Sequence, residues 1–170
     1  GQVNPSDITQ SLAKGARLRG VRIVEDTAVL GIELERGRVQ AVLTTRGRVS
    51  CEVVVNCAGQ WARQVGLLAG VNVPLVSVQH QYLITDAMAG MPRDLPTLRD
   101  PDRLTYYKED VGGLVMGGYE PNPRPWAVDG FPDNFNFQLL QPDWDHFQPI
   151  LDLALPRVPA LATAGIKELI

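Results

Sequence analysis

His80 is the residue of this sequence best suited to acid–base chemistry. It lies in the stretch VSVQHQYLI. The two-residue period of a strand places it on one face with four apolar or aromatic residues: Val76, Val78, Tyr82 and Ile84. A titratable ring on such a face has two interpretations. It is either a hydrogen-bonded core histidine or a site residue whose protonation is set by burial.

Two adjacent tyrosines, Tyr106 and Tyr107, stand in the next predicted strand. They must point to opposite faces, so at most one of them can share a face with His80. Packing is the ordinary role of aromatic residues in strands. Gly117 and Gly118 follow, and two glycines inside a strand indicate a bulge or a closely bound ligand.

A second candidate site is the stretch VVVNCAGQWAR, residues 53–63. Its valines are apolar on both faces, which is typical of a strand covered on both sides in a parallel α/β sheet. The small residues that follow, Asn56 to Gly59, allow a close approach of backbone. That approach serves either tight helix–sheet packing or a nucleotide lying over the carboxyl end of the strand. Both interpretations remain open.

Regular elements must position these residues. A helix is expected over 4–20, because Asn4 suits the N-cap and Pro5 the first helical position. A β-meander is expected next, with short strands at VRIVED, AVLGIELE and RVQAVLTT, then the valine run and a helix from Trp61.

After Pro74 the pattern changes to a mostly antiparallel sheet. We expect a long strand over 75–85, a hairpin turning near 111–113, and a helix that starts near Asp143 and is kinked or restarted at Pro149. The fold class is therefore mixed α/β. Its two halves meet near Val73–Pro74.

Composition excludes several classes of function. The chain has 170 residues, 45% of them hydrophobic and 21% charged, with a net charge of −3, so we expect neither a nucleic-acid nor a membrane partner. No CxxC or HExxH spacing is present, so no metal site is expected. A complete GxGxxG motif is also absent. Two cysteines, Cys51 and Cys57, are interpreted as reduced thiols in a cytoplasmic protein.

Several stretches together resemble one family. VVVNCAGQWAR is similar to the VVNAAGxWA segment of FAD-dependent amine dehydrogenases and oxidases of the D-amino-acid-oxidase superfamily, closest to the dimethylglycine/sarcosine dehydrogenase branch. GQVNPSDITQSLAKGAR resembles the GxVDP helix of that family, and PLVSVQHQYLIT resembles its HQY strand. LPTLRDPDRLTYYKEDVGGLVMGGYEPNP resembles its LRDxD…YY…GxYE hairpin.

The resemblance implies a Rossmann-type FAD-binding domain with a substrate domain built on a large antiparallel sheet and flanking helices. Residues 1–73 would be part of the FAD-binding domain, and residues 74–170 would be the substrate-binding domain. We expect the chain to be an internal piece of a longer protein. The glycine fingerprint would precede it and a flavin-contacting segment would follow it. The isolated chain is accordingly expected to lack both flavin and turnover.

The resemblance also assigns residues. His80 and Tyr106 would face the substrate amine as the catalytic pair, lining one water-poor hollow. The cofactor-binding residues would be Ala28 and Val29, where backbone meets the adenine, and Cys57, Ala58, Gly59 and Trp61, near the FAD phosphates. No residue is assigned to the substrate carboxylate; Arg99 and Arg103 are candidates by type only, or surface charges.

The function implied is oxidative demethylation of a dimethylglycine- or sarcosine-like N-methyl amino acid, with an acceptor protein or oxygen taking the electrons. Neutral His and Tyr side chains in an apolar pocket would favour the unprotonated amine. The alternatives are another enzyme of the superfamily, such as a sarcosine oxidase or a glycerol-phosphate dehydrogenase, and a non-catalytic binding module with the same fold. Apolar surfaces left exposed on the piece make dimerisation an expectation as well.

Overall fold

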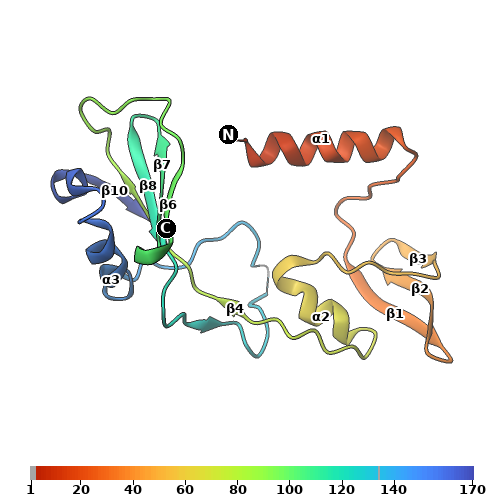
Figure 1. The fold of residues 1–170 in the computed structure, drawn as a ribbon. Helices are drawn as coiled ribbons and strands as arrows, with labels where there is room; N and C mark the ends of the chain where they lie inside the picture. The colour runs from red at the N-terminus through yellow and green to blue at the C-terminus, as the bar shows by residue number, and fades with distance from the viewer. Residues whose placement is uncertain (1–2, 134) are drawn as a thin grey trace. The chain divides into compact units, whose positions relative to one another are not determined.

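The computed structural model describes residues 3–133 and 135–170 (Figure 1). The chain divides into two compact units. One consists of Val3–Ser77 with Ala127–Phe131, and the other of Val78–Trp126 with Pro132–Ile170.

The first unit begins with helix α1 (Pro5–Leu18). The side chain of Asn4 accepts hydrogen bonds from the backbone N–H groups of Ser6 and Asp7, which confirms the expected N-cap. Pro5 stands at the first helical position, as predicted. No residue of α1 is buried, and Leu12 is 70% exposed.

A three-stranded antiparallel sheet follows, in the order β1–β2–β3. Its strands are β1 (Val29–Glu35), β2 (Arg38–Thr44) and β3 (Gly47–Ser50). The predicted turn at Arg36–Gly37 is confirmed, with φ of 49° and 76°. The strand expected at VRIVED is absent. Residues 21–26 form no ladder in the described part of the chain.

The valine run is not a strand either, which corrects the expectation of a buried strand. Val53 and Val55 are 75% and 79% exposed. No ladder among residues 3–133 and 135–170 includes residues 53–55, so their backbone has no neighbouring strand with which to pair. The helix after them is confirmed, as the 3-10 turn η1 (Gly59–Trp61) followed by α2 (Ala62–Leu67).

The second unit is built on a five-stranded antiparallel sheet in the order β10–β5–β8–β7–β6. Its strands are β5 (Tyr82–Thr85), β6 (Leu98–Asp100), β7 (Thr105–Asp110), β8 (Gly113–Gly118) and β10 (Ile166–Leu169). The hairpin β7–β8 turns at Val111–Gly112, as predicted. The short strands β4 (Ser77–Val78) and β9 (Pro125–Trp126) pair with each other. Two 3-10 turns complete the chain, η2 (Pro101–Arg103) and η3 (Pro159–Thr163).

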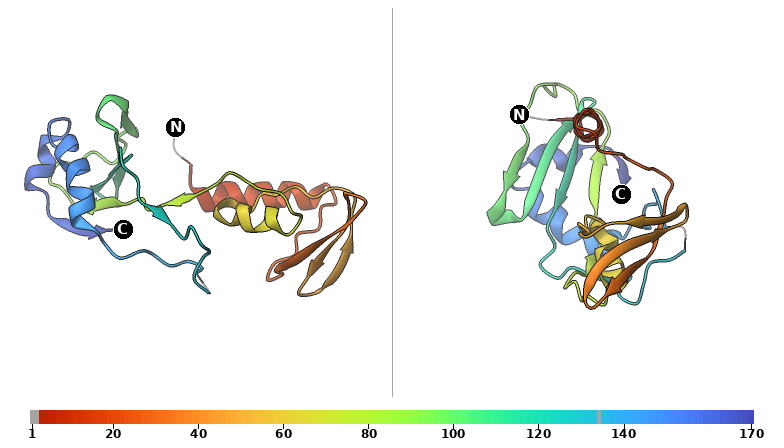
Figure 2. Two further views of the ribbon diagram at one scale, coloured as in Figure 1. Left: turned by 90° about the horizontal axis from the view of Figure 1, so that it is seen from below. Right: turned by 90° about the vertical axis from the view of Figure 1, so that its right-hand side faces the viewer.

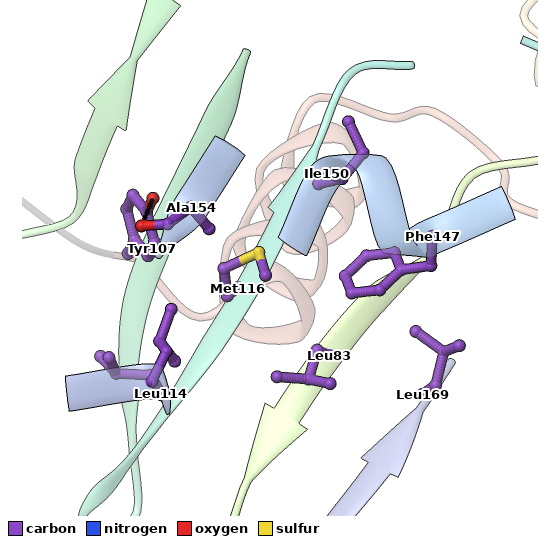
Figure 3. Packing of buried hydrophobic residues seen from close by; sticks show 9 residues of the cluster. Leu83, Tyr107, Leu114, Met116, Phe147, Ile150, Ala154 and Leu169 are labelled. Carbon is purple, nitrogen blue, oxygen red and sulfur yellow. Dashed lines mark hydrogen bonds between the residues drawn. The ribbon is translucent and has the colours of Figure 1, made fainter. Parts of the chain in front are cut away.

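Helix α3 (Trp144–Ala154) covers one face of this sheet and remains beside β7 and β8 in each view (Figures 1 and 2). The Asp143 side chain accepts from the N–H of His146, which confirms the expected helix start. The helix continues through Pro149 without a restart. Between helix and sheet lies the core, which Figure 3 shows in close-up: Leu83, Tyr107, Leu114, Met116, Phe147, Ile150, Ala154 and Leu169.

The long strand expected over 75–85 is broken into β4 and β5. The break arises because the backbone changes partner within this stretch. Gln79 donates to the carbonyl of Arg124, whereas Tyr82 exchanges both of its backbone hydrogen bonds with Ile170. The side chain of Gln81 is buried, and its Nε2 donates a hydrogen bond to the carbonyl of Gln141 in the loop before α3. His80 therefore lies at a gap between two ladders.

Candidate functional site: a histidine–tyrosine cluster

His80 and Tyr106 meet on the face of the sheet that α3 does not cover. Along β7, Tyr107 is 3% exposed and belongs to the core, so its neighbour Tyr106 points to the other face. The hydroxyl of Tyr106 lies 3.3 Å from Nε2 of His80. The prediction that at most one tyrosine of the pair shares a face with His80 is confirmed, and that tyrosine is Tyr106. The alternative of a core histidine is wrong.

Three further residues complete the cluster, and sequence reasoning did not single them out as a group. The ring of Tyr119 stacks on that of His80, with centroids 5.5 Å apart and planes at 27°. Oε2 of Glu120 lies 3.3 Å from Nδ1 of His80. The guanidinium carbon of Arg99 lies 4.9 Å from the centroid of the Tyr119 ring. We call these five side chains the His80 cluster.

The available signal for Tyr119 and Glu120 was their position in GGYE, directly after β8. Residues that directly follow a central strand such as β8 lie between the ends of the two neighbouring strands, where they can contact side chains of both. Arg99 and Arg103, which were equal candidates by type, are now distinguished. Arg99 lies in the cluster, whereas Nε of Arg103 lies 3.8 Å from the Asp100 carboxylate.

The register of the sheet explains the position of Tyr106. Gly117 of β8 lies opposite both Tyr82 and Tyr106. A Cβ at Gly117 would collide with the phenol end of Tyr106. The ring therefore occupies the space that a side chain at residue 117 would need, which only glycine leaves free.

Gly117 and Gly118, for which a bulge or a closely bound ligand was expected, both allow close packing of neighbouring groups. The β7–β8 pairing is regular through Gly117 and Gly118, so there is no bulge. At Gly118 a Cβ would come within 2.9 Å of the Leu104 carbonyl and would collide with Ile150 of α3. One glycine thus admits the Tyr106 ring and the other admits the helix.

The environment of Tyr106 keeps its hydroxyl protonated. Burial raises the pKa of Tyr106 above its ordinary value, and the nearby Tyr119, Tyr82 and Glu120 add to the effect. Tyr106 is therefore a neutral phenol at physiological pH that both donates and accepts hydrogen bonds.

The expected exclusion of water is not seen. The His80 side chain is 37% exposed, and Tyr119 is 50% exposed. The pair is brought together as predicted, but on an open face of the sheet. A water-poor hollow would require a further covering element over this face.

The residues assigned to the adenine lie at the start of β1. Both backbone groups of Ala28 are engaged with Thr45, because its N–H donates to the Thr45 hydroxyl and its carbonyl accepts from the Thr45 N–H. Val29 opposes Thr44 in the β1–β2 ladder and is 42% exposed. These residues can offer a ligand van der Waals surface, but Ala28 has no free backbone hydrogen bond to offer.

The residues assigned to the phosphates form an open turn before α2. Cys57 and Gly59 are exposed, and nothing lies within 4 Å of a Cβ built at Gly59, whose φ is 55°. The N–H of Ala58 is engaged by the side chain of Asn56. The Trp61 ring packs at 5.5 Å from that of Phe131. This turn therefore leaves room for a bulky ligand.

An apolar cavity of about 270 Å³ lies in the same unit. Its lining includes Ile32, Val39, Val54, Asn56 and Val65. None of the six residues assigned to the cofactor lines it.

Among residues 3–133 and 135–170, no group of three potential metal-ligating side chains lies together. No helix in these ranges is long and apolar enough to span a membrane.

Comparison with known proteins identifies the family. The family model described as "DAO: FAD dependent oxidoreductase" matches residues 1–168. Sarcosine dehydrogenase from Mus musculus is 39% identical over 173 residues, covering 99% of this chain and 18% of the relative. The pyruvate dehydrogenase phosphatase regulatory subunit from Mus musculus is 37% identical over 171 residues, covering 99% of this chain and 19% of the relative.

The fold is also found in a solved structure. L-proline dehydrogenase from P. horikoshii superimposes with a TM-score of 0.76 at 22% identity, covering 99% of this chain and 43% of that chain. The chain spans about a fifth of the length of the two curated relatives. It belongs to the family of FAD dependent oxidoreductases.

Proposed function

We propose that the chain carries the amine-binding site of a flavin-dependent enzyme that oxidatively demethylates a sarcosine- or dimethylglycine-like amino acid. The observation that carries this proposal is the 3.3 Å approach of the Tyr106 hydroxyl to Nε2 of His80, with Tyr119 stacked on the imidazole. The family and the 39% identity to a sarcosine dehydrogenase support it.

The cofactor of the whole protein is FAD in this proposal, which, when bound, accepts the hydride equivalent from the N-methyl carbon. Residues 1–73 would contribute to its binding and residues 74–170 would bind the substrate. Cys57, Ala58, Gly59 and Trp61 would hold the phosphate side, since their turn is open. Ala28 and Val29 would contact the adenine through their surface.

The chain's own residues would bind and orient the substrate. The neutral phenol of Tyr106 can accept a hydrogen bond from the one N–H of an unprotonated secondary amine such as sarcosine, whereas unprotonated dimethylglycine has no N–H and would meet the phenol by contact alone. A covering element that removed water would disfavour the charged ammonium form of either amine. Arg99 lies opposite Tyr106 in the β6–β7 ladder, so its guanidinium can hold the carboxylate of the same amino acid. Oxidation then yields an iminium that hydrolyses to formaldehyde and the shorter amine.

A second candidate is a non-catalytic, regulatory role. One specific observation favours it, because a relative with 37% identity is named as a regulatory subunit. Such a protein would keep the fold and would not need the His80–Tyr106 pair to meet a substrate.

Anaerobic reduction of the flavin in the full-length protein tests these possibilities. The protein is mixed with sarcosine, dimethylglycine, proline or glycerol phosphate, and the flavin absorbance is followed. Bleaching by the N-methyl amino acids supports the proposal. Bleaching by proline or glycerol phosphate alone identifies another enzyme of the superfamily, and bleaching by none supports the regulatory role. The 170-residue chain itself is expected to show no flavin band.

Two further properties are part of the proposal. The exposed apolar side chains of Leu12, Val53 and Val55 favour association of the isolated chain into dimers. A mass that stays monomeric as concentration rises would contradict this. The proposed compartment is the cytoplasm, on the basis of the two free cysteines. The two Mus musculus relatives are named as mitochondrial, so cell fractionation is the test.

A further inference from the structure

Glu120 is a nearly buried carboxylate with an incomplete set of partners. Its side chain is 7% exposed. Oε2 lies 3.3 Å from Nδ1 of His80, while Oε1 is buried without a hydrogen-bond partner among residues 3–133 and 135–170. A buried charged oxygen left without a partner is costly, so its presence calls for a role other than stability.

Asp100, a second buried carboxylate of the same unit, differs from Glu120 in its hydrogen-bond partners. It is 5% exposed, and Nε of Arg157 donates to it at 2.6 Å. It also accepts from the N–H of Arg103. Asp100 is therefore well supplied with partners. Glu120, at similar burial, is paired in the described part of the chain with an imidazole alone, and an imidazole carries charge only when protonated.

The hydrogen-bond partners of His80 determine which of its two ring nitrogens carries the hydrogen. A carboxylate only accepts hydrogen bonds, so a neutral imidazole next to Glu120 must carry its hydrogen on Nδ1. Nε2 is then an acceptor and must receive the hydroxyl hydrogen of Tyr106. Since the pKa of Tyr106 is raised, this hydrogen is present throughout the physiological range. The lone pairs of the phenol oxygen are left to accept from a ligand N–H.

We propose that Glu120 is a positioning residue, which fixes His80 in the Nδ1–H tautomer and thereby directs the Tyr106 oxygen as an acceptor towards the N–H of a secondary-amine substrate of the sarcosine type. The tautomer follows from the geometry of this chain alone. Its consequence for catalysis rests on the proposed function.

Long-range ¹H–¹⁵N NMR of the histidine rings in the 170-residue chain tests the tautomer directly. The chain has two histidines, so a His146→Gln variant assigns the signals. The expected result at pH 8 is a His80 ring with its hydrogen on Nδ1. Free imidazole side chains favour the Nε2–H form, so a predominantly Nε2–H His80 in the unmutated chain would overturn the proposal without need of a variant.

The variant Glu120→Leu keeps the volume and removes the acceptor. The expected result is a shift of His80 towards the Nε2–H form. The matched control is Glu168→Leu, an exposed glutamate of β10, which should leave the His80 signals unchanged. An unaltered tautomer in folded Glu120→Leu would overturn the proposal, as would an equal shift in the control.

The proposed effect of Glu120 on catalysis is tested in the flavin-loaded full-length protein. Glu120→Leu should slow flavin reduction at saturating sarcosine by roughly tenfold or more, because the phenol that accepts from the amine N–H loses its fixed orientation. An unchanged rate in a variant whose His80 tautomer has shifted would overturn the proposed effect of Glu120 on catalysis. If no N-methyl amino acid reduces the flavin of the unmutated protein, the proposed function fails, while the tautomer result still decides the role of Glu120 within the chain.

Discussion

Tyr106 fills the space that a side chain at Gly117 would occupy, and its hydroxyl in turn reaches Nε2 of His80. This pairing across β7 and β8 links the sheet register to the chemistry of the site. Glycine is required at position 117 because any side chain there would collide with the Tyr106 ring, and not because of a turn or a bulge.

Gly117→Ala is expected to destabilise the chain by about 1–3 kcal/mol, since the added methyl group overpacks against Tyr106. Strand propensity alone would predict the opposite sign. Gly31→Ala in β1 is the control, because its Cβ would meet only ordinary contacts of 3.5 Å or more with Leu43. Urea denaturation measures both. Adding Tyr106→Ala to Gly117→Ala should recover most of the loss, and strict additivity would contradict the explanation.

The raised pKa of Tyr106 predicts how stability changes at alkaline pH. A pKa that is higher in the folded than in the unfolded chain contributes stability below about pH 10, which is lost as pH rises through the folded value. Tyr106→Phe should therefore lose less stability between pH 8 and pH 11 than the unmutated chain does. Unfolding midpoints across this range supply the comparison. Identical slopes for the two proteins would count against a buried phenol.

Asp100 predicts the behaviour at acid pH. The hydrogen bond from Arg157 is the main reason that the pKa of Asp100 is lowered, so its contribution is present above about pH 4 and is lost as pH falls through the folded value. Asp100→Asn should be clearly less stable than the unmutated chain at pH 7, with the difference shrinking below pH 4. Asp102→Asn, at an exposed neighbour, serves as control. A difference that does not vary with pH would contradict the ion-pair explanation.

Val111 stands in the hairpin turn with φ of 49°, a left-handed conformation that β-branched residues rarely adopt. It is 76% exposed, so little burial is lost on substitution. Val111→Asn should stabilise the chain by about 1 kcal/mol, because Asn tolerates this conformation and suits such a turn. Val128→Asn, also at an exposed valine but without positive φ, should change stability by less than about 0.5 kcal/mol. Equal effects of the two would refute the strain argument.

Local patterns in the sequence predicted the elements that depend on local chemistry. The Asn4 cap, the turn at Arg36–Gly37 and the helix start at Asp143 are all present, because each depends on a few neighbouring residues. Alternation also separated Tyr106 from Tyr107 correctly. The valine run was misread because its apolar faces indicate burial, but a strand forms only where another strand is available to pair with it.

The cluster itself could be predicted only in part. His80 was singled out from strand alternation and Tyr106 was paired with it through resemblance, and neither their distance nor the solvent exposure of His80 follows from strand alternation. Their contact depends on the strand order β5–β8–β7, which places residues 26 positions apart side by side. Glu120 was missed because its significance lies in burial and in an unpaired oxygen, which are properties of the fold and not of the sequence pattern.

The most direct test of the proposed function is the rate of flavin reduction by a saturating N-methyl amino acid in the full-length protein carrying His80→Gln. We expect a rate lower by roughly tenfold or more, because the Tyr106 hydroxyl loses the ring nitrogen that orients it. His146→Gln, at the other histidine of the chain, should leave the rate close to that of the unmutated protein. An unchanged rate in His80→Gln would remove His80 from the site and contradict the account.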